Sequence, residues 1–340
     1  MLKARMLALT MVLAVLLPAA GAAPAQQPSP HAIAIPRWFS NSLLDFKDEV
    51  PEAARQGKRL MVYFGQDGCP YCKALMQHTF APGPVQDKLR RHFTAVAVNI
   101  WGDAEATWVD GRAFTEKTLA RELNVQFTPT LLFLGDDGRV RVRLNGYLPP
   151  ERFEPVLDYL IAGRDRSESL ADYLAARSTA APLPPRPPAP YLLRDPAVLT
   201  RKAGGKSLAV LFESSACKAC AEMHAEAFAR PGLRRLLQRF DVARLLPGQP
   251  ATLRLPDGRT SSAREWSREL GIMLHPTVVF FDDRAREVFR FDGYLRPFHI
   301  ESAFDYVASG AYRTEPQFQR YVQARAERLR AAGQPVDLWR

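Results

Sequence analysis

Four cysteines, the only ones in this chain of 340 residues, form two C-x-x-C pairs. The first pair is Cys69 and Cys72, and the second is Cys217 and Cys220. Two thiols at this spacing can close into a disulfide and reopen, so they can exchange electrons with other thiols and disulfides. In each pair we expect the first cysteine, at a helix start that favours its thiolate, to be the catalytic nucleophile. The second cysteine then resolves the mixed disulfide.

Two other uses of these cysteines are weaker. A C-x-x-C disulfide closes a very short loop, so it removes little entropy from the unfolded chain and is a poor structural staple. Two C-x-x-C pairs can also form a zinc site with four cysteine ligands. Here, however, the pairs belong to separate repeats at an offset of 148 residues, from Cys69 to Cys217. We therefore expect redox chemistry, with no metal and no cofactor.

An X-Pro-Thr element follows each cysteine pair by about 60 residues and opens an apolar run. The X-Pro pairs are Thr128-Pro129 and His275-Pro276. We expect both prolines to be cis and to lie against the cysteines, where the preceding backbone is open to an extended client segment. The alternative is an ordinary trans proline at the start of a strand.

The two predicted sites differ in their neighbouring residues. Pro70-Tyr71 separates the first cysteines and is neutral, whereas Lys218-Ala219 places a cation beside Cys217. His275 stands where the first half has Thr128, and it could act as a base or as a cation that lowers the thiol pKa. The alternative for His275 is a tolerated surface residue in a degenerate copy. If both cations act on Cys217, the second site is the more oxidising one and electrons flow to it from the first.

The second half of the chain repeats the first at an offset of 147 or 148 residues. Apolar runs indicate strands at 59–64, 93–98, 130–134, 140–144 and 207–212. Helices are expected at 116–123, at 150–161 and from a cap at Asn41 or Ser42 to residue 55. The order β-α-β-α-β-β-α is that of thioredoxin. The sequence thus predicts an α/β fold with two tandem thioredoxin-like domains, each a mixed central β-sheet flanked by helices. Segments 99–112 and 245–260 are expected to be insertions. Trp101 and Trp108 lie in the first of them and are expected in the core, with the rim or a substrate contact as alternatives.

A basic start at Lys3 and Arg5, an apolar run at 6–17 and small residues up to Ala25 predict a secretory signal peptide. Its removal would leave a soluble periplasmic protein, exported through the Sec pathway, that meets the membrane only through the signal. The run is short for a span, which needs roughly 20 residues; an uncleaved anchor is the alternative.

The expected organisation has six parts. They are a signal peptide at 1–25, an exposed leader at 26–40, a first domain at 41–178, a proline-rich linker at 179–190, a second domain at 191–333 and a tail at 334–340. The linker should form an extended polyproline strut of roughly 30 Å.

The formal net charge of +10 is spread over the sequence, with basic residues mixed among acidic ones. We expect no nucleic-acid surface, because such a surface needs a clustered basic patch interleaved with aromatic residues. A basic face still favours an acidic partner protein.

At these motifs the chain resembles the exported thioredoxin-like family of the SoxW type, associated with bacterial sulfur oxidation. The matching stretches are 68–73, 99–103, 119–123 and 127–130 in the first half, and 291–299 and 310–313 in the second. The resemblance implies a periplasmic reductant of client protein thiols and disulfides, recharged by a membrane electron donor of the CcdA or DsbD type. Related exported thioredoxins serve cytochrome c maturation. Typical members carry one domain, and the buried aspartate of cytosolic thioredoxins is replaced here by Tyr63 or Leu211.

The leading function is therefore a thiol–disulfide oxidoreductase that reduces or isomerises protein disulfides. An oxidant that installs disulfides has the same motifs, since the direction depends on reduction potential. A non-enzymatic client-binding or chaperone module with one degenerate redox domain is the third alternative, and metal delivery is the fourth.

Overall fold

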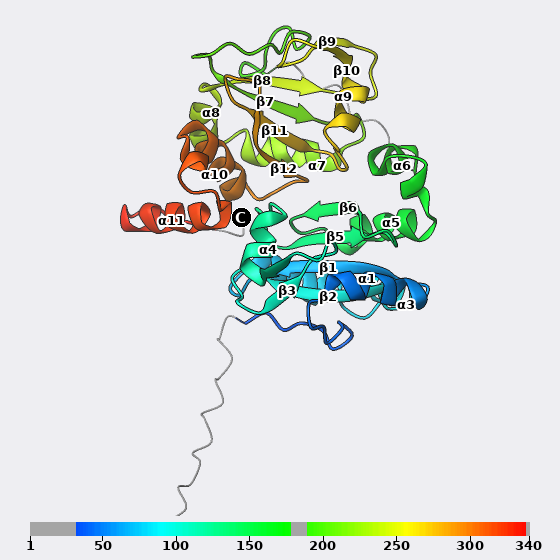
Figure 1. Cartoon of the computed structure of the whole chain (residues 1–340). Helices are drawn as coiled ribbons and strands as arrows, with labels where there is room; N and C mark the ends of the chain where they lie inside the picture. The colour runs from blue at the N-terminus through cyan, green and yellow to red at the C-terminus, as the bar shows by residue number, and fades with distance from the viewer. Residues whose placement is uncertain (1–31, 178–188, 338–340) are drawn as a thin grey trace, which may run out of the picture.

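The structure is a computed structural model that describes residues 32–177 and 189–337 (Figure 1). The predicted signal peptide at 1–25, the leader up to residue 31, the linker at 179–188 and the end of the tail at 338–340 lie outside the described residues. Among the described residues, no helix has both the length and the apolar character that a membrane span requires.

The first domain is built on a four-stranded mixed sheet in the order β2-β1-β5-β6. β1 (Arg59–Gly65) runs parallel to β2 (Phe93–Asn99), while β5 (Thr130–Leu134) is antiparallel to both β1 and β6 (Val140–Asn145). β1 and β5 are buried almost throughout, as their continuous apolar runs predict for strands covered on both faces.

Helices cover both faces of this sheet. They are α1 (Phe46–Arg55), α2 (Pro70–Ala74), the π-helical turn η1 (Leu75–Thr79), α3 (Pro84–His92), α4 (Glu116–Glu122), α5 (Pro150–Ile161), the 3-10 turn η2 (Arg164–Arg166) and α6 (Leu170–Arg177). Side chains of η1, α3 and α5 form one core with one sheet face. Those of α1 and α4 form a second core with the other face. The predicted mixed sheet flanked by helices is confirmed.

The start of α1 differs from the prediction. Asp45 is the N-cap and accepts the Asp48 N–H, so Asn41 and Ser42 lie outside the helix. Ser42 instead accepts the Leu44 N–H at 2.7 Å, and Leu44 takes a positive φ of 61°. A serine side chain that bonds its own neighbouring backbone favours a turn, which delays the helix by one turn.

The second domain repeats this architecture with the sheet order β12-β11-β7-β8. Its strands are β7 (Ser207–Phe212), β8 (Phe240–Leu245), β11 (Thr277–Phe281) and β12 (Glu287–Asp292). Its helices and turns are α7 (Lys218–Glu222), η3 (Met223–Ala227), α8 (Pro231–Leu237), α9 (Ala263–Glu269), α10 (Pro297–Ala308), η4 (Ala311–Arg313) and α11 (Phe318–Ala331).

Each predicted insertion contributes the first strand of a small two-stranded antiparallel sheet, whose second strand begins at the end of the insertion or just after it. These pair β3 (Glu105–Thr107) with β4 (Ala113–Thr115), and β9 (Thr252–Arg254) with β10 (Thr260–Ser262). Trp108 packs in the core as expected, with 6% of its surface exposed. Trp101 is half-buried: it packs against the edge of this core, donates its indole N–H to Gln66 and lines the cavity beside Cys69, which fits the rim alternative better than the core.

The two domains pack against each other through equivalent surfaces, one above the other in Figure 1. β6 lies beside β12, and Asn145 donates to Asp292, its counterpart at the 147 offset, at 2.6 Å. Phe127 of the first domain belongs to the core of the second, and Leu274, its counterpart, belongs to the core of the first. The pair of domains therefore resembles a dimer with approximate twofold symmetry.

Candidate functional site

The first cysteine pair lies directly after the central strand β1. Cys69 is the N-cap of α2 and is joined to Cys72 by a disulfide. The Cys69 Sγ also accepts the Cys72 N–H at 3.0 Å. Cys69 keeps 4% of its surface exposed and Cys72 none. Only the first sulfur is therefore within reach of another molecule, as a nucleophile at this position requires.

The Thr128-Pro129 peptide bond is cis and lies against the cysteines. The Thr128 carbonyl oxygen is 3.4 Å from the Cys69 Sγ, and the Gln66 amide donates to the Thr128 hydroxyl at 3.1 Å. Within the described residues the Thr128 N–H has no acceptor, so it is available to an extended segment lying across Cys69.

The second site repeats this geometry. Cys217 caps α7, is disulfide-bonded to Cys220 and accepts the Cys220 N–H at 3.0 Å. Their exposures are 7% and 0%. His275-Pro276 is also cis. The predicted residues of the first site are thus brought together, and the second domain has the same cysteine N-cap, disulfide and cis X-Pro bond.

Neither Lys218 nor His275 places an effective positive charge beside Cys217. His275 is half-buried, its Nε2 atom is buried with no hydrogen-bond partner among the described residues, and burial lowers its pKa to about 4. His275 is therefore neutral at pH 7, so neither a cationic role nor a plain surface position is correct. The Lys218 side chain is 83% exposed and lies 3.8 Å from Glu222. Solvent and Glu222 screen its charge, which removes the basis for the predicted direction of electron flow.

The position of the usual buried aspartate holds Tyr63 in the first domain. Tyr63 is 2% exposed, its hydroxyl has no partner among the described residues, and burial raises its pKa. A Cβ atom at Gly65 would lie 1.9 Å from that hydroxyl, so the tyrosine needs a glycine there.

Sequence reasoning missed a buried acid in the second domain. Glu213, at the position equivalent to Gly65, is 1% exposed and lies 2.5 Å from the Nε2 atom of His224. Tyr191 contacts the other ring nitrogen of His224 at 3.0 Å. Two features of the sequence could have indicated this pair: His224 follows Cys220 by one helical turn, and Glu213 is a charged residue directly after a buried strand.

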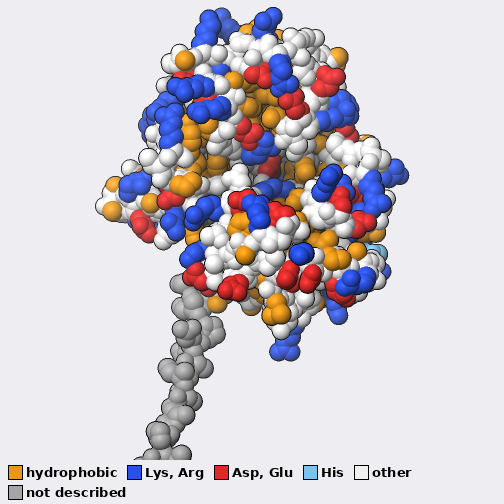
Figure 2. Space-filling view, in the orientation of Figure 1, with side chains coloured by type: hydrophobic (Ala, Val, Ile, Leu, Met, Phe, Trp, Pro, Cys, Tyr) orange, Lys and Arg blue, Asp and Glu red, His pale blue; other side chains and the backbone are white. Residues whose placement is uncertain are grey.

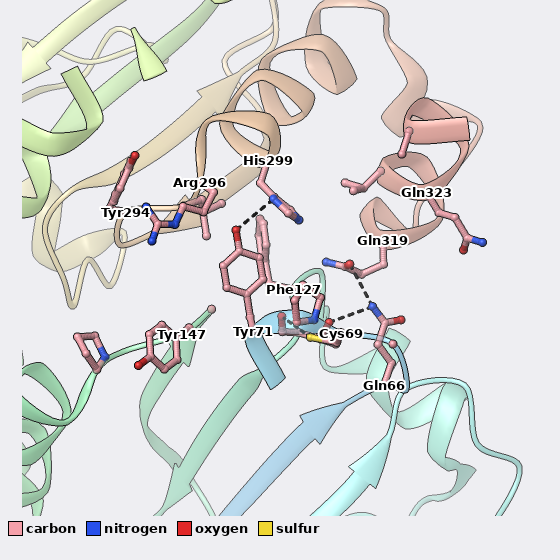
Figure 3. Close-up of a pocket in the computed structure, with 18 of the residues that line it drawn as sticks. Gln66, Cys69, Tyr71, Phe127, Tyr147, Tyr294, Arg296, His299, Gln319 and Gln323 are labelled. Carbon is pink, nitrogen blue, oxygen red and sulfur yellow. Dashed lines mark hydrogen bonds between the residues drawn. The ribbon is translucent and has the colours of Figure 1, made fainter. Parts of the chain in front are cut away.

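Cys69 opens into a cavity of about 710 Å³ between the domains (Figure 3). Tyr71 points across it to His299, with 3.4 Å between the Tyr71 hydroxyl and His299 Nδ1. Gln66 donates to Gln319 of α11 at 3.3 Å. The second domain therefore forms the opposite side of the first cysteine site, which the sequence did not reveal.

The second domain has a smaller cleft of about 220 Å³, lined by Glu213, His275 and residues of α6, but neither Cys217 nor Cys220 is among its lining residues. Asp172 on α6 pairs with Arg264 at 3.2 Å and Arg268 at 2.9 Å. In the described parts of the chain, no group of three or more His, Cys, Asp or Glu residues is placed to hold a metal ion.

The thioredoxin-like domain family matches this sequence twice, at residues 46–161 and 195–308. The chain therefore belongs to the thioredoxin-like family and carries its domain in tandem, with a C-x-x-C motif in each copy. Both matches lie inside the domain ranges expected from the sequence. No curated protein matches the chain.

Solved structures with a similar fold each cover less than two fifths of the chain. A thioredoxin-fold protein from Helicobacter pylori is 14% identical, with a TM-score of 0.36, over 39% of this chain and 89% of its own. A thioredoxin from Thermus thermophilus is 28% identical, with a TM-score of 0.27, over 34% of this chain and 83% of its own. The periplasmic thioredoxin SoxS from Paracoccus pantotrophus is 21% identical, with a TM-score of 0.24, over 31% of this chain and 99% of its own.

Proposed function

We propose that this protein is an exported thiol–disulfide oxidoreductase that reduces disulfides or thiol adducts of client proteins. The observation that carries the proposal is the first site itself. There the outer cysteine of a C-x-x-C disulfide is slightly exposed, opens into a cavity and lies 3.4 Å from the carbonyl oxygen that precedes Pro129.

In the proposed reaction, the Cys69 thiolate attacks one sulfur of a client disulfide. A mixed disulfide forms and the other client sulfur leaves as a thiolate, which takes a proton. Cys72 then loses its proton and attacks the Cys69 sulfur, which releases the second client thiol. The client gains two electrons and two protons, and the protein ends with the Cys69–Cys72 disulfide, the state seen here.

The proposed setting is the periplasm, reached after the signal peptide is cleaved, where the protein would act as a SoxW-like reductant of client proteins. Each turnover oxidises the protein, so a donor must reduce it again. A membrane electron donor of the CcdA or DsbD type fits this need. The support for this setting is the N-terminal pattern of the sequence and the family resemblance. The basic and acidic side chains intermixed on the surface (Figure 2) give no reason to add a nucleic acid to the partners.

Trapping tests the function. Cys72→Ser, in a chain that also carries Cys217→Ser and Cys220→Ser, removes the resolving thiol and should accumulate a client joined to Cys69. Cys69→Ser, which keeps Cys72 as the one thiol in the same background, is the matched control. No client captured by the Cys72→Ser variant, or equal capture through Cys72 in the control, would refute the assignment.

A second candidate concerns the second domain, which could bind clients without redox turnover. The observation in its favour is the smaller cleft covered by α6. Cys220→Ser, with the first pair changed to serine, separates the two cases: a client joined to Cys217 shows a redox site, and client binding without a covalent bond shows a binding module.

A further inference from the structure

We propose that a client segment reacts with Cys69 inside the cavity between the domains, and that the second domain supplies one wall of this binding site. The inference rests on the proposed function and specifies its substrate: a cysteine carried on an extended stretch of a few residues. Cystines on the surface of a folded protein are excluded, because the second domain stands where that surface would lie.

Both domains line the cavity. Gln66, Tyr71 and Thr128 face it from the first domain around Cys69. The facing wall comes from the second domain, where His299 lies in the first turn of α10 and Gln319 and Gln323 lie on α11 (Figure 3). A segment lying on Cys69 therefore contacts α10 and α11 as well.

The wall is held by specific contacts. The Phe127 ring packs on Phe318 of α11, with 5.2 Å between their centroids. The Gln126 side chain accepts the Phe318 N–H at 3.0 Å, and the Gln319 amide donates to the Gln126 carbonyl at 3.0 Å. Because these contacts include buried aromatic area and satisfied backbone groups, separating the domains costs free energy. Entering the cavity therefore costs a client segment less free energy than separating the second domain from the first.

The size of the cavity selects the client. About 710 Å³ lies within the range of sites that enclose drug-sized ligands, roughly 300–1,000 Å³. A stable protein–protein contact instead needs about 800 Å² of surface on each partner. The cavity therefore admits a short segment and not a folded surface.

The polarity of the cavity favours an uncharged segment. Its lining carries four acids (Asp67, Glu151, Glu222 and Glu226) and four bases (Arg152, Lys218, Arg296 and Arg330), so the charges balance. Two of the acids are paired within the cavity: Glu222 lies 3.4 Å from Arg152 and 3.8 Å from Lys218, and Glu226 accepts from Tyr294. Neutral amide and phenol groups remain to bond a client backbone, and burial lowers the His299 pKa to about 4, which leaves that ring neutral too. A strongly charged segment would have to break these pairs.

Filling the cavity tests the proposal. Gln323 lines the cavity and is exposed, so Gln323→Trp should obstruct it; Ala324→Trp adds the same bulk to the same helix outside the cavity lining. Both variants carry Cys217→Ser and Cys220→Ser, so that only the first site reacts. The probes are an uncharged hexapeptide with a mixed disulfide on its cysteine, and the compact reagent 4,4′-dithiodipyridine.

Gln323→Trp should slow reduction of the peptide by about tenfold or more, roughly 1.4 kcal/mol, relative to Ala324→Trp. The rate with dithiodipyridine should stay within about threefold, which also shows that the site is intact. Equal peptide rates in the two variants would overturn the inference. If the unsubstituted chain fails to react even with dithiodipyridine, the proposed function fails instead.

A second measurement uses the protein without any substitution in α10 or α11, the wall of the cavity. We expect it to reduce the peptide at least about tenfold faster than a surface cystine of a folded protein. Equal rates would show that the second domain does not restrict access, which contradicts the proposal.

Discussion

The two sites share a backbone geometry but differ in the residues that can ionise. The second domain has Glu213, which pairs with His224, and His275, which lines the same cleft as Glu213. The equivalent positions of the first domain hold Gly65, Met76 and Thr128. These three positions are therefore ionisable in the second domain and not in the first, where the acids Asp67 and Glu151 line the cavity that Cys69 opens into.

The buried Glu213–His224 pair should contribute to stability. Glu213→Gln keeps the shape but removes the charge from a 2.5 Å contact. We expect a loss of about 1–3 kcal/mol in the free energy of unfolding, because a buried polar group is left poorly paired. Chemical denaturation measures it, with Glu222→Gln as control, since a surface pair contributes about 0–1 kcal/mol. Equal losses in the two variants would contradict a structural role for the pair.

His299 makes stability depend on pH. Burial lowers its pKa to about 4, while the unfolded chain takes up the proton near the usual 6.5. The unfolded state therefore binds more protons between these values, so stability is lost as the pH falls from about 6.5 to 4, by up to about 3 kcal/mol. His275 acts in the same direction.

The His299→Gln variant should show a shallower fall in unfolding free energy between pH 6.5 and 4. His78→Gln, at an exposed position, is the matched control and should keep the original slope. An unchanged slope in His299→Gln would show that His299 is not buried in its neutral form.

Sequence reasoning located the cysteines and the X-Pro pairs because their spacing is short-range and repeated. It misjudged His275 because the charge of a histidine depends on its burial, which is a property of the packed fold. Glu213 was missed for the same reason: a lone acid after a strand has no visible partner until His224 is placed beside it.

Among the elements, the duplicated terminal helices were predictable, but their docking was not. α6 and α11 occupy equivalent positions, and each reaches the other domain: Phe318 of α11 packs on Phe127, and Leu170 of α6 shares a core with Leu274. A periodic pattern identifies the apolar face of a helix and leaves its partner open. The same limit explains the small hairpins found in the expected insertions.

Phe318 should be a main contributor to the docking of α11. It is fully buried, and its ring lies 5.2 Å from Phe127 and 4.8 Å from Phe289. Phe318→Ala should cost about 3–5 kcal/mol of unfolding free energy. It should also speed hydrogen exchange in α11. Leu329→Ala, at a half-buried position on the same helix, should cost about 1 kcal/mol; a similar cost for both would contradict the assigned role.

At the scale of the whole molecule, the repeat predicted two domains but not their mutual packing. The sequence predicted an extended proline-rich strut between the domains but no contact between them. In the structure Asn145 and Asp292 lie 2.6 Å apart, and each domain contributes a side chain to the core of the other. Contacts between domains depend on surface shape, which no single-sequence pattern encodes. The consequence for function is that Cys69 opens into a cavity of about 710 Å³ between the domains, whereas the cleft of about 220 Å³ is lined by His275 and not by Cys217.

The central claim is that the first pair is a reversible dithiol working as a reductant. The direct test is the reduction potential of Cys69–Cys72 in the Cys217→Ser/Cys220→Ser chain, equilibrated with graded glutathione and dithiothreitol buffers and read by the mass of alkylated thiols. The account predicts reversible exchange with a potential nearer to about −270 mV, that of thioredoxin, than to about −120 mV, that of a strong oxidant. A potential near the oxidant value, or a pair that stays closed throughout the series, would contradict it.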